Sequence, residues 1–151
     1  MSPTDSPAPE VRPAPEPDPT DAATPWSRGV RRAPGGALTL AGHELPDLAG
    51  THGTPVYLLD VSDLQARAQE YVAAFHEAFA YLAGAEVYYA GKAFLSVAVA
   101  RWVHTEGMSI DVASGTELAT ALRAGVPGER IALHGNNKSD AELTEAVHAG
   151  V

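Results

Sequence analysis

Three residues of this sequence, Lys92, Asp111 and His134, carry side chains that could share one chemical task. A neutral lysine amine attacks a carbonyl to form a Schiff base, a carboxylate stabilises a nearby positive charge, and an imidazole transfers protons near neutral pH. Lys92 follows the apolar residues 87–90, which predicts a partly enclosed amine. Exclusion of water favours the neutral form that can react.

Each of these residues also has an ordinary structural interpretation. The lysine could extend from a strand end into solvent, the aspartate could cap the helix that follows it, and a backbone group could satisfy the histidine. Residue type alone leaves both interpretations open, so the elements that carry the three side chains have to be considered.

The hydrophobic pattern predicts three successive strand–loop–helix units. Strands are expected at 86–90, 108–112 and 130–134, so that they begin at a regular interval of 22 residues. Strands joined by helices of this length run parallel with right-handed crossovers, which gives a doubly wound sheet or a β/α barrel. Glycines 107, 125 and 150 are expected to end the helices. The apolar helix faces comprise Leu95, Ala98, Val99, Trp102 and Val103, then Leu118, Ala121 and Leu122, then Leu143, Ala146 and Val147.

In either fold the ligand site lies at the carboxyl ends of the parallel strands. That rule brings Lys92, Asp111 with Ser114, and His134 with residues 136–138 to one edge of the sheet. Ser114 also fits the role of a helix N-cap, because a glutamate follows three residues later. Capping boxes are predicted at Ser62 with Gln65, Ser114 with Glu117, and Ser139 with Glu142.

Upstream of the three units the chain changes character twice. Residues 1–25 are rich in proline and acidic residues and predict a disordered tail, and residues 26–53 predict ordered loops and short elements. The partial β/α region is expected over 54–151, opening with a strand at 56–59 and a helix from Ser62 to Gly84. The apolar stripe of that helix comprises Leu64, Ala68, Tyr71, Val72, Phe75, Phe79 and Leu82.

Composition excludes several classes of protein. A net charge of -9 with 10 basic residues disfavours nucleic-acid binding, and no apolar run reaches the roughly 18 residues that cross a membrane. The absence of cysteine excludes disulfides and thiol catalysis in these 151 residues. A chain of this length favours a single domain. No secretory signal is recognisable, so a cytoplasmic location is expected. The remaining histidines, at 43, 52, 76, 104 and 148, lack metal-ligand spacing, and no metal is proposed.

Three motifs, in this order and spacing, resemble the start of the diaminopimelate decarboxylases. They are Tyr-Ala-Gly-Lys-Ala-Phe at 89–94, Asp-Val-Ala-Ser-Gly-Thr-Glu-Leu at 111–118 and His-Gly-Asn-Asn-Lys-Ser at 134–139. The segment 53–60 is similar to that family's first strand, and the resemblance covers about three quarters of the chain. The family belongs to the pyridoxal-phosphate-dependent decarboxylases of ornithine, lysine, arginine and diaminopimelate, which share an alanine-racemase-like barrel.

The resemblance implies specific roles for the three residues. Lys92 matches the catalytic lysine that holds pyridoxal 5'-phosphate as a Schiff base, Asp111 matches an acidic residue near that Schiff base, and His134 is expected at the edge of the cofactor. The run 136–138 is expected to shape the rim of the pocket. The implied reaction converts a small amino acid, meso-diaminopimelate, to lysine and carbon dioxide.

Two alternatives remain open at this stage. The lysine motif is shared with decarboxylases of ornithine, arginine and carboxynorspermidine, although Phe94 and the run 111–118 favour the diaminopimelate branch. The chain could also be a non-catalytic cofactor-binding protein or a degenerate fragment. Carbon dioxide release from meso-diaminopimelate and from ornithine, compared in a full-length version, would separate the decarboxylases, and borohydride labelling of Lys92 would test the non-catalytic alternative.

The same resemblance makes the fold the N-terminal portion of a (β/α)8 barrel of the TIM type, ending after about three β/α units. The strand at 56–59 would join a C-terminal β-domain, and the complete enzyme would be a homodimer. The family's phosphate-binding loop, its histidine stacked on the pyridine ring, the carboxylate at the ring nitrogen and the cysteine donated across the dimer are all expected beyond Val151. The 151 residues alone are therefore expected to bind the cofactor poorly and not to turn over.

Overall fold

The computed structural model describes residues 26–151, so the predicted tail 1–25 lies outside the described residues. The chain divides into two compact units, one ending at Val56 and the other covering Tyr57–Val151. This division lies close to the predicted boundary between residues 26–53 and 54–151, and the second unit has its own core. Each unit is described by itself.

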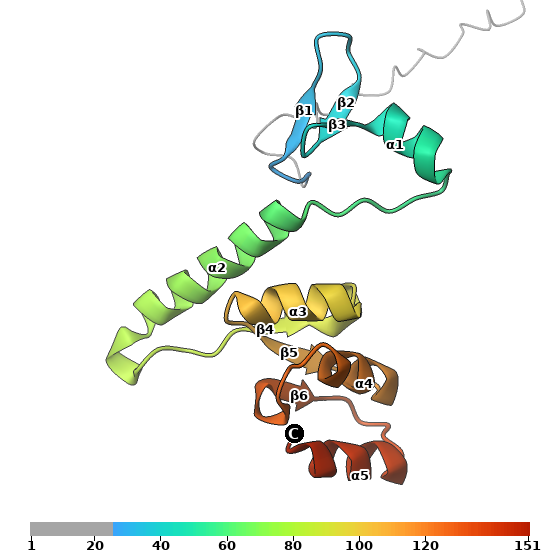
Figure 1. The fold of residues 1–151 in the computed structure, drawn as a ribbon. Coiled ribbons are helices and arrows are strands. Elements are labelled where there is room, and N and C mark those ends of the chain that lie inside the picture. The colour runs from blue at the N-terminus through green and yellow to red at the C-terminus, as the bar shows by residue number, and fades with distance from the viewer. Residues whose placement is uncertain (1–25) are drawn as a thin grey trace, which may run out of the picture. The chain divides into compact units, whose positions relative to one another are not determined.

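The first unit contains a small antiparallel sheet that was not predicted. Val30 of the first strand pairs with Leu40 of the second, and Ala41 and Gly42 join the second strand to the third in a two-residue turn with positive φ at both residues, 50° and 85°. Such a turn matches the twist of the strands it joins. The elements are β1 Val30–Arg32, β2 Leu38–Leu40, β3 His43–Glu44 and α1 Leu45–His52 (Figure 1).

The second unit contains a parallel sheet in the order β4-β5-β6, which confirms the three predicted strands. The strands begin 21 and 22 residues apart, close to the predicted interval. Each is followed by a helix, and the long α2 precedes the first. The bounds are α2 Val61–Ala78, β4 Tyr88–Ala90, α3 Val97–Thr105, β5 Ser109–Val112, α4 Gly115–Arg123, β6 Ile131–Leu133 and α5 Asp140–Ala149, with single 3-10 turns η1 Ala80–Leu82, η2 Gly91–Ala93 and η3 Gly128–Arg130 (Figure 1).

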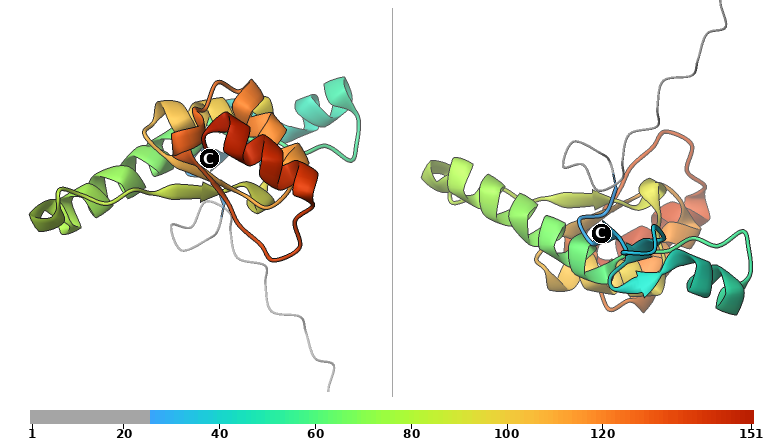
Figure 2. Two further views of the ribbon diagram at one scale, coloured as in Figure 1. Left: turned by 90° about the horizontal axis from the view of Figure 1, so that it is seen from below. Right: turned by 90° about the horizontal axis from the view of Figure 1, so that it is seen from above.

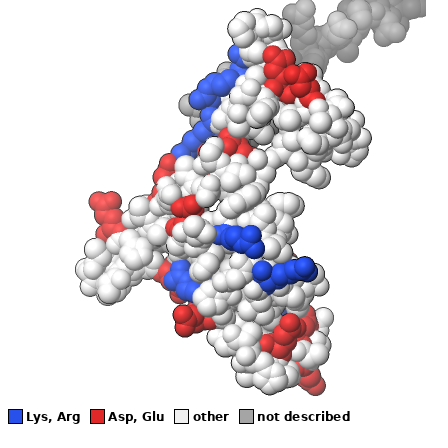
Figure 3. All heavy atoms as spheres, viewed as in Figure 1, with Lys and Arg blue, Asp and Glu red and all other residues white. Residues whose placement is uncertain are grey.

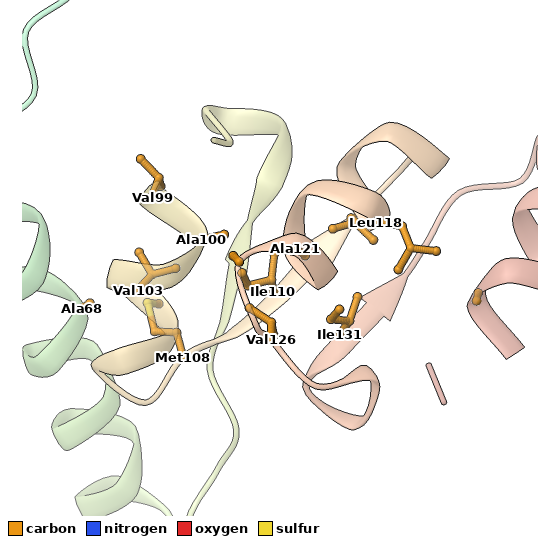
Figure 4. Packing of buried hydrophobic residues seen from close by; sticks show 13 residues of the cluster. Ala68, Val99, Ala100, Val103, Met108, Ile110, Leu118, Ala121, Val126 and Ile131 are labelled. Atoms are coloured by element: carbon orange, nitrogen blue, oxygen red, sulfur yellow. The ribbon is translucent and has the colours of Figure 1, made fainter. Parts of the chain in front are cut away.

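The core of the second unit lies between the sheet and the helices α3 and α4 (Figure 4). Ile110 and Val112 of β5 are completely buried there, together with Leu118 of α4 and Val103 of α3. Full burial of one such aliphatic side chain stabilises the fold by about 1.5–3 kcal/mol. Ala68 of α2 reaches the same cluster, so the first half of α2 also packs on it.

The opposite face of β5 carries Ser109 and Asp111, because successive side chains along a strand point to alternate faces. Figure 2 shows α3 and α4 on one side of β4. A doubly wound sheet would place helices on both sides. The described residues therefore cover one face of the sheet with helices and leave polar side chains on the other.

The amino ends of the three strands are joined by a polar cluster around Glu86. Its carboxylate accepts hydrogen bonds from Ser109 Oγ at 2.5 Å and from the Tyr88 hydroxyl at 2.9 Å. Arg130 Nη1 lies 3.1 Å from the same carboxylate, and its Nη2 donates to the Gly107 carbonyl at 2.6 Å. The Ser109 hydroxyl, then the Tyr88 hydroxyl and the charge of Arg130, hold the pKa of Glu86 below its ordinary value.

The predicted strand at 56–59 is wrong. No described strand pairs with this segment, whose backbone has no regular structure, and Tyr57 is 99% exposed. Its apolar, β-branched and aromatic residues favour a strand. A strand forms only where a neighbouring strand supplies hydrogen bonds, so this composition alone was insufficient.

The helix α2 differs from its prediction at both ends. Asp60, rather than Ser62, is the N-cap, and it accepts from the backbone N–H of Asp63 and from the Ser62 hydroxyl. Gln65 donates instead to Glu106, 2.7 Å away, so the predicted capping box does not form. A carboxylate one position before the helix is a strong cap and fixes an earlier start.

The C-terminal half of α2 also departs from the predicted stripe. The helix ends at Ala78 rather than near Gly84, and Tyr71 and Phe75 are 58% and 42% exposed. Only the first half of the stripe meets the core. The periodicity identified the helix but could not show how far its neighbours extend along it.

The caps of the later helices agree more closely with the sequence pattern. Ser139 and Glu142 form the predicted capping box of α5. Ser114 caps α4 by accepting from the Glu117 N–H, but the Glu117 carboxylate accepts from the Ala113 N–H rather than completing the box. In α3 the N-cap is Ser96, so Leu95 precedes the helix in which it was expected.

Charge and hydropathy of the described residues add two observations. None of the helices in residues 26–151 is both long and apolar enough to cross a membrane. In the face shown in Figure 3, Lys and Arg side chains occur in small separate groups among acidic ones. The absence of nucleic-acid binding stays a prediction.

Candidate active site

The structure brings the three candidate residues to one edge of the parallel sheet. Ala90, Asp111 and Ala132 are neighbours across the three strands. Lys92 lies two residues after the first of these, in the turn η2, and His134 lies two residues after the last. The prediction that they meet at the carboxyl ends of the strands is therefore confirmed in position, whereas their chemical roles stay predictions.

Asp111 and His134 are directly paired. The imidazole Nδ1 lies within hydrogen-bonding distance of Asp111 Oδ1, and the two side chains are 26% and 48% exposed. The backbone N–H of His134 donates to the Val112 carbonyl at 2.9 Å, which extends the ladder past the end of β6. The pair joins two adjacent strand ends through one carboxylate and one imidazole.

The structural roles that the sequence suggested for Asp111 and His134 are not the ones observed. The cap of α4 is Ser114, so Asp111 is not a helix cap. The side chain of His134 contacts a carboxylate rather than a backbone group. Both side chains are therefore committed to each other at the sheet edge, and Ser114 has the structural role of an N-cap.

Lys92 is exposed, so the predicted partial enclosure of its amine is wrong for the described residues. The residues before Lys92 are apolar because β4 packs on the core, where Tyr89 and Ala90 are half-buried. Their composition does not predict whether the turn after the strand is enclosed. Enclosure of a side chain at a strand end depends on the loops around it. Among residues 26–151 no hydrogen bond or ion pair engages this amine, so it is accessible to a reactant.

Gly91 holds the turn against the neighbouring strand, a feature that the sequence analysis missed. It is buried, and a Cβ added there would lie 2.9 Å from the Asp111 carbonyl oxygen. No real side chain tolerates that approach to a backbone atom, so only glycine fits at this position. A glycine between a strand and a candidate lysine could have predicted this close backbone contact.

The helix N-termini at this edge are occupied by side chains of the chain itself. Glu142 accepts from the Gly115 N–H at 2.8 Å and from the Ser139 N–H at 2.9 Å, so one carboxylate joins the starts of α4 and α5. The Ser139 N–H, then the Gly115 N–H, lower the pKa of Glu142 to about 2. A helix N-terminus is an ordinary site for phosphate. In these two helices a carboxylate already takes that place.

The loop after His134 has mixed exposure. Asn136 and Asn137 are exposed and Lys138 is half-buried. The Lys138 amine folds back over Gly135, where an added Cβ would lie 2.6 Å from it. This position is compatible with the predicted rim of a pocket, which stays a prediction.

The other histidines do not join this edge. Those at 43, 52, 76 and 148 are exposed, and the ring of His104 lies 3.2 Å from the Met108 carbonyl. No group of three potential ligands for a metal ion occurs among residues 26–151. The ordinary interpretation of the five histidines stays a prediction.

Known proteins match this chain over most of its described length. The profile of the pyridoxal-dependent decarboxylases, described as their pyridoxal binding domain, matches residues 64–151. A diaminopimelate decarboxylase from Mycobacterium leprae is 51% identical over 126 residues, which are 83% of this chain and 25% of that protein. One from Corynebacterium efficiens is 47% identical over 123 residues, 81% of this chain and 25% of its own length.

Solved structures agree with the sequence matches. A diaminopimelate decarboxylase from M. jannaschii aligns with a TM-score of 0.76 at 27% identity, covering 83% of this chain and 29% of that one. A lysine/ornithine decarboxylase from Vibrio vulnificus aligns with a TM-score of 0.57 at 25% identity, covering 70% and 27%. The chain thus spans about a quarter of the length of the curated relatives it matches.

Proposed function

This chain belongs to the pyridoxal-dependent decarboxylase family, and we propose that it supplies the lysine that anchors the cofactor in a diaminopimelate decarboxylase. The observation that supports this most is the position of Lys92, in the turn directly after β4 and on the sheet edge that carries the Asp111–His134 pair. An accessible amine on the same sheet edge as a carboxylate and an imidazole is the set of groups that such an anchor requires.

The residues present fit the carbonyl end of pyridoxal 5'-phosphate. The primary amine of Lys92 would hold the cofactor covalently, and Asp111 would stabilise positive charge near that attachment while His134 orients its carboxylate. When bound, the cofactor supplies the electron sink that makes loss of carbon dioxide from an amino acid possible. Lys92, once released, would be available to move protons at the reacting carbon.

The phosphate end has no matching group in the described residues. Glu142 and Glu117 already accept from the backbone N–H groups around the start of α4, and two carboxylates there would repel a phosphate. We therefore assign the phosphate contacts to another part of the complete protein, by which we mean this chain continued to the length of its relatives.

The one-sided covering of the sheet supports a β/α barrel as the complete fold. Helices α3 and α4 pack on one face, and the other face presents Ser109 and Asp111. In a barrel that second face is turned to the interior, and the strand ends there form the active site. A homodimer is part of the same proposal, since family members are expected to build the site across a two-fold axis.

The choice of substrate rests on the names of the relatives. The two curated relatives described above are diaminopimelate decarboxylases, whereas the V. vulnificus enzyme, named for lysine and ornithine, is the weaker structural match. We expect the complete protein to release carbon dioxide from meso-diaminopimelate and not from ornithine. Faster release from ornithine, arginine or carboxynorspermidine would transfer the protein to another branch of the family.

The cofactor anchor is tested by reduction of the complete protein with borohydride in the presence of pyridoxal phosphate. We expect the label on the tryptic peptide 68–101, which trypsin no longer divides after Lys92. Lys138 is the only other lysine of the chain and serves as the internal control. Labelling at Lys92 without carbon dioxide release would favour the non-catalytic alternative, and labelling elsewhere would contradict the anchor.

The 151 residues alone are expected to bind the cofactor weakly and to form no product. They contain the anchoring amine, but the described residues offer no phosphate contact. Equilibrium dialysis with pyridoxal phosphate, together with an assay for lysine, measures both properties. Formation of lysine by the 151-residue chain would overturn this proposal.

A further inference from the structure

Two residues flank the turn that carries Lys92 and are joined by a hydrogen bond. The hydroxyl of Tyr89 donates to the Phe94 carbonyl oxygen at 2.7 Å. Tyr89 is the middle residue of β4, and Phe94 is the first residue after the turn η2. The bond therefore closes a loop whose other members include Gly91 and Lys92.

The position of the Tyr89 hydroxyl is set by the core. Its ring is half-buried and packs against the hydrophobic cluster, and its backbone is paired with Ile110 of β5. A tyrosine hydroxyl is protonated at neutral pH, and burial raises the pKa of this one further, so it can donate. Because the ring is held by the core, its hydroxyl restrains the position of the Phe94 carbonyl. A donor on a flexible surface side chain would move together with the carbonyl and would not restrain it.

The other side of the turn is fixed by backbone contact. Ala90 pairs with Asp111, and buried Gly91 approaches the Asp111 carbonyl so closely that an added Cβ would lie 2.9 Å from it. The segment that carries Lys92 is thus held before the lysine by β5 and after it by the Tyr89 hydroxyl. The lysine side chain itself is exposed and gains no order from packing.

We propose that Tyr89 is a positioning residue for Lys92: its hydroxyl fixes the turn η2 through the Phe94 carbonyl and keeps the amine at the sheet edge of Asp111 and His134. This inference rests on the proposed role of Lys92 as the cofactor anchor. Tyr89 lies on the helix-covered face of the sheet and acts through the backbone. A reaction that needs the amine in one orientation gains rate from such a restraint.

The test compares two adjacent tyrosines in the complete protein. Tyr89→Phe removes the hydroxyl and keeps the ring in the core, and Tyr88→Phe is the matched control, because its hydroxyl bonds to Glu86 at the opposite end of the sheet. The rate of covalent attachment to Lys92 is followed by stopping samples with borohydride at set times. We expect Tyr89→Phe to slow attachment about three- to tenfold, the effect of one lost hydrogen bond, and Tyr88→Phe to change it less than about twofold.

Steady-state kinetics and thermal melting exclude a merely structural effect. Tyr89→Phe should lower kcat and leave KM for the amino acid nearly unchanged, with a melting temperature no lower than that of Tyr88→Phe. Attachment at the normal rate in Tyr89→Phe, or equal slowing in both variants, would overturn the inference. If the complete protein without substitutions carries no label on Lys92, the proposed function is overturned instead. The two failures are therefore distinguishable.

Discussion

The two ends of the parallel sheet use the same kinds of residue for different purposes. At the amino ends, one carboxylate, Glu86, binds Ser109, Tyr88 and Arg130 and so ties all three strands together. At the carboxyl ends, the Asp111 carboxylate binds His134, and Lys92 is exposed.

This difference separates stability from chemistry along strands of only three or four residues. Polar groups that satisfy one another rigidify a structure and are unavailable to a ligand. The amino ends are of that kind, since buried Ser109 depends on Glu86 for its hydrogen bond. At the carboxyl ends Lys92 is exposed, and the Asp111–His134 pair is itself partly exposed, so these groups stay accessible, as a site for reactants requires.

The largest effect is expected from Lys92→Ala at the carboxyl ends. Decarboxylation by the complete protein should fall on the order of a thousandfold or more, because the covalent anchor is lost. The melting temperature should stay close to normal, since the side chain is exposed and substitutions at such sites change stability by about 0.5 kcal/mol or less. Activity within tenfold of normal would show that another group anchors the cofactor.

A smaller effect is expected from Asp111→Asn, which keeps the shape and removes the charge. We expect slower attachment of pyridoxal phosphate by about tenfold, because the carboxylate no longer stabilises the positive charge at the attachment. Borohydride trapping over time measures this rate. The matched control is Asp140→Asn at the exposed first residue of α5, and equal rates in the two variants would remove Asp111 from the site.

At the amino ends the expected effect is on stability. Glu86→Ala leaves the buried Ser109 hydroxyl without its partner and should lower the free energy of unfolding by about 1–2 kcal/mol. The double variant with Ser109→Ala should lose less than the sum of the two single changes, because both partners are then absent. Urea unfolding gives these values, and strict additivity would mean that the bond contributes nothing.

The smallest effect is expected from acid titration of Glu142, which joins α4 and α5. Its pKa is lowered from 4.5 to about 2 in the folded chain, so its contribution to stability is complete above pH 4.5 and is lost as the pH falls toward about 2. The N–H signal of Gly115 should shift over the lower part of that range in NMR spectra. Glu142→Gln should remove the transition, and a transition that survives this substitution would belong to another group.

Much of the second unit could be predicted because its signals are local. Hydrophobic runs, glycines and serine caps recur at about the same interval, and they identified the three strands, the capping box of α5 and the shared edge of Lys92, Asp111 and His134. Parallel topology then follows from the helices between the strands. The strand order and the parallel topology were therefore sufficient to place Lys92, Asp111 and His134 on one edge of the sheet.

The remaining features depend on neighbours that the sequence does not reveal. The segment 56–59 has strand composition but no partner strand, and Lys92 follows an apolar run but lies in an exposed turn. The cluster around Glu86 was also missed, although Glu86, Ser109 and Arg130 recur with nearly the period of the strands. That recurrence was the available signal for a second polar edge. Location in the cytoplasm and dimerisation stay predictions.

The division between the two ends is tested by one measurement, the site of covalent labelling after borohydride reduction in three forms of the complete protein. Normal protein and Glu86→Ala, measured at a temperature where both are folded, should both carry pyridoxal phosphate on peptide 68–101, and Lys92→Ala should carry none there. Label on the Lys138 peptide in the normal protein, or loss of label in folded Glu86→Ala, would contradict the account.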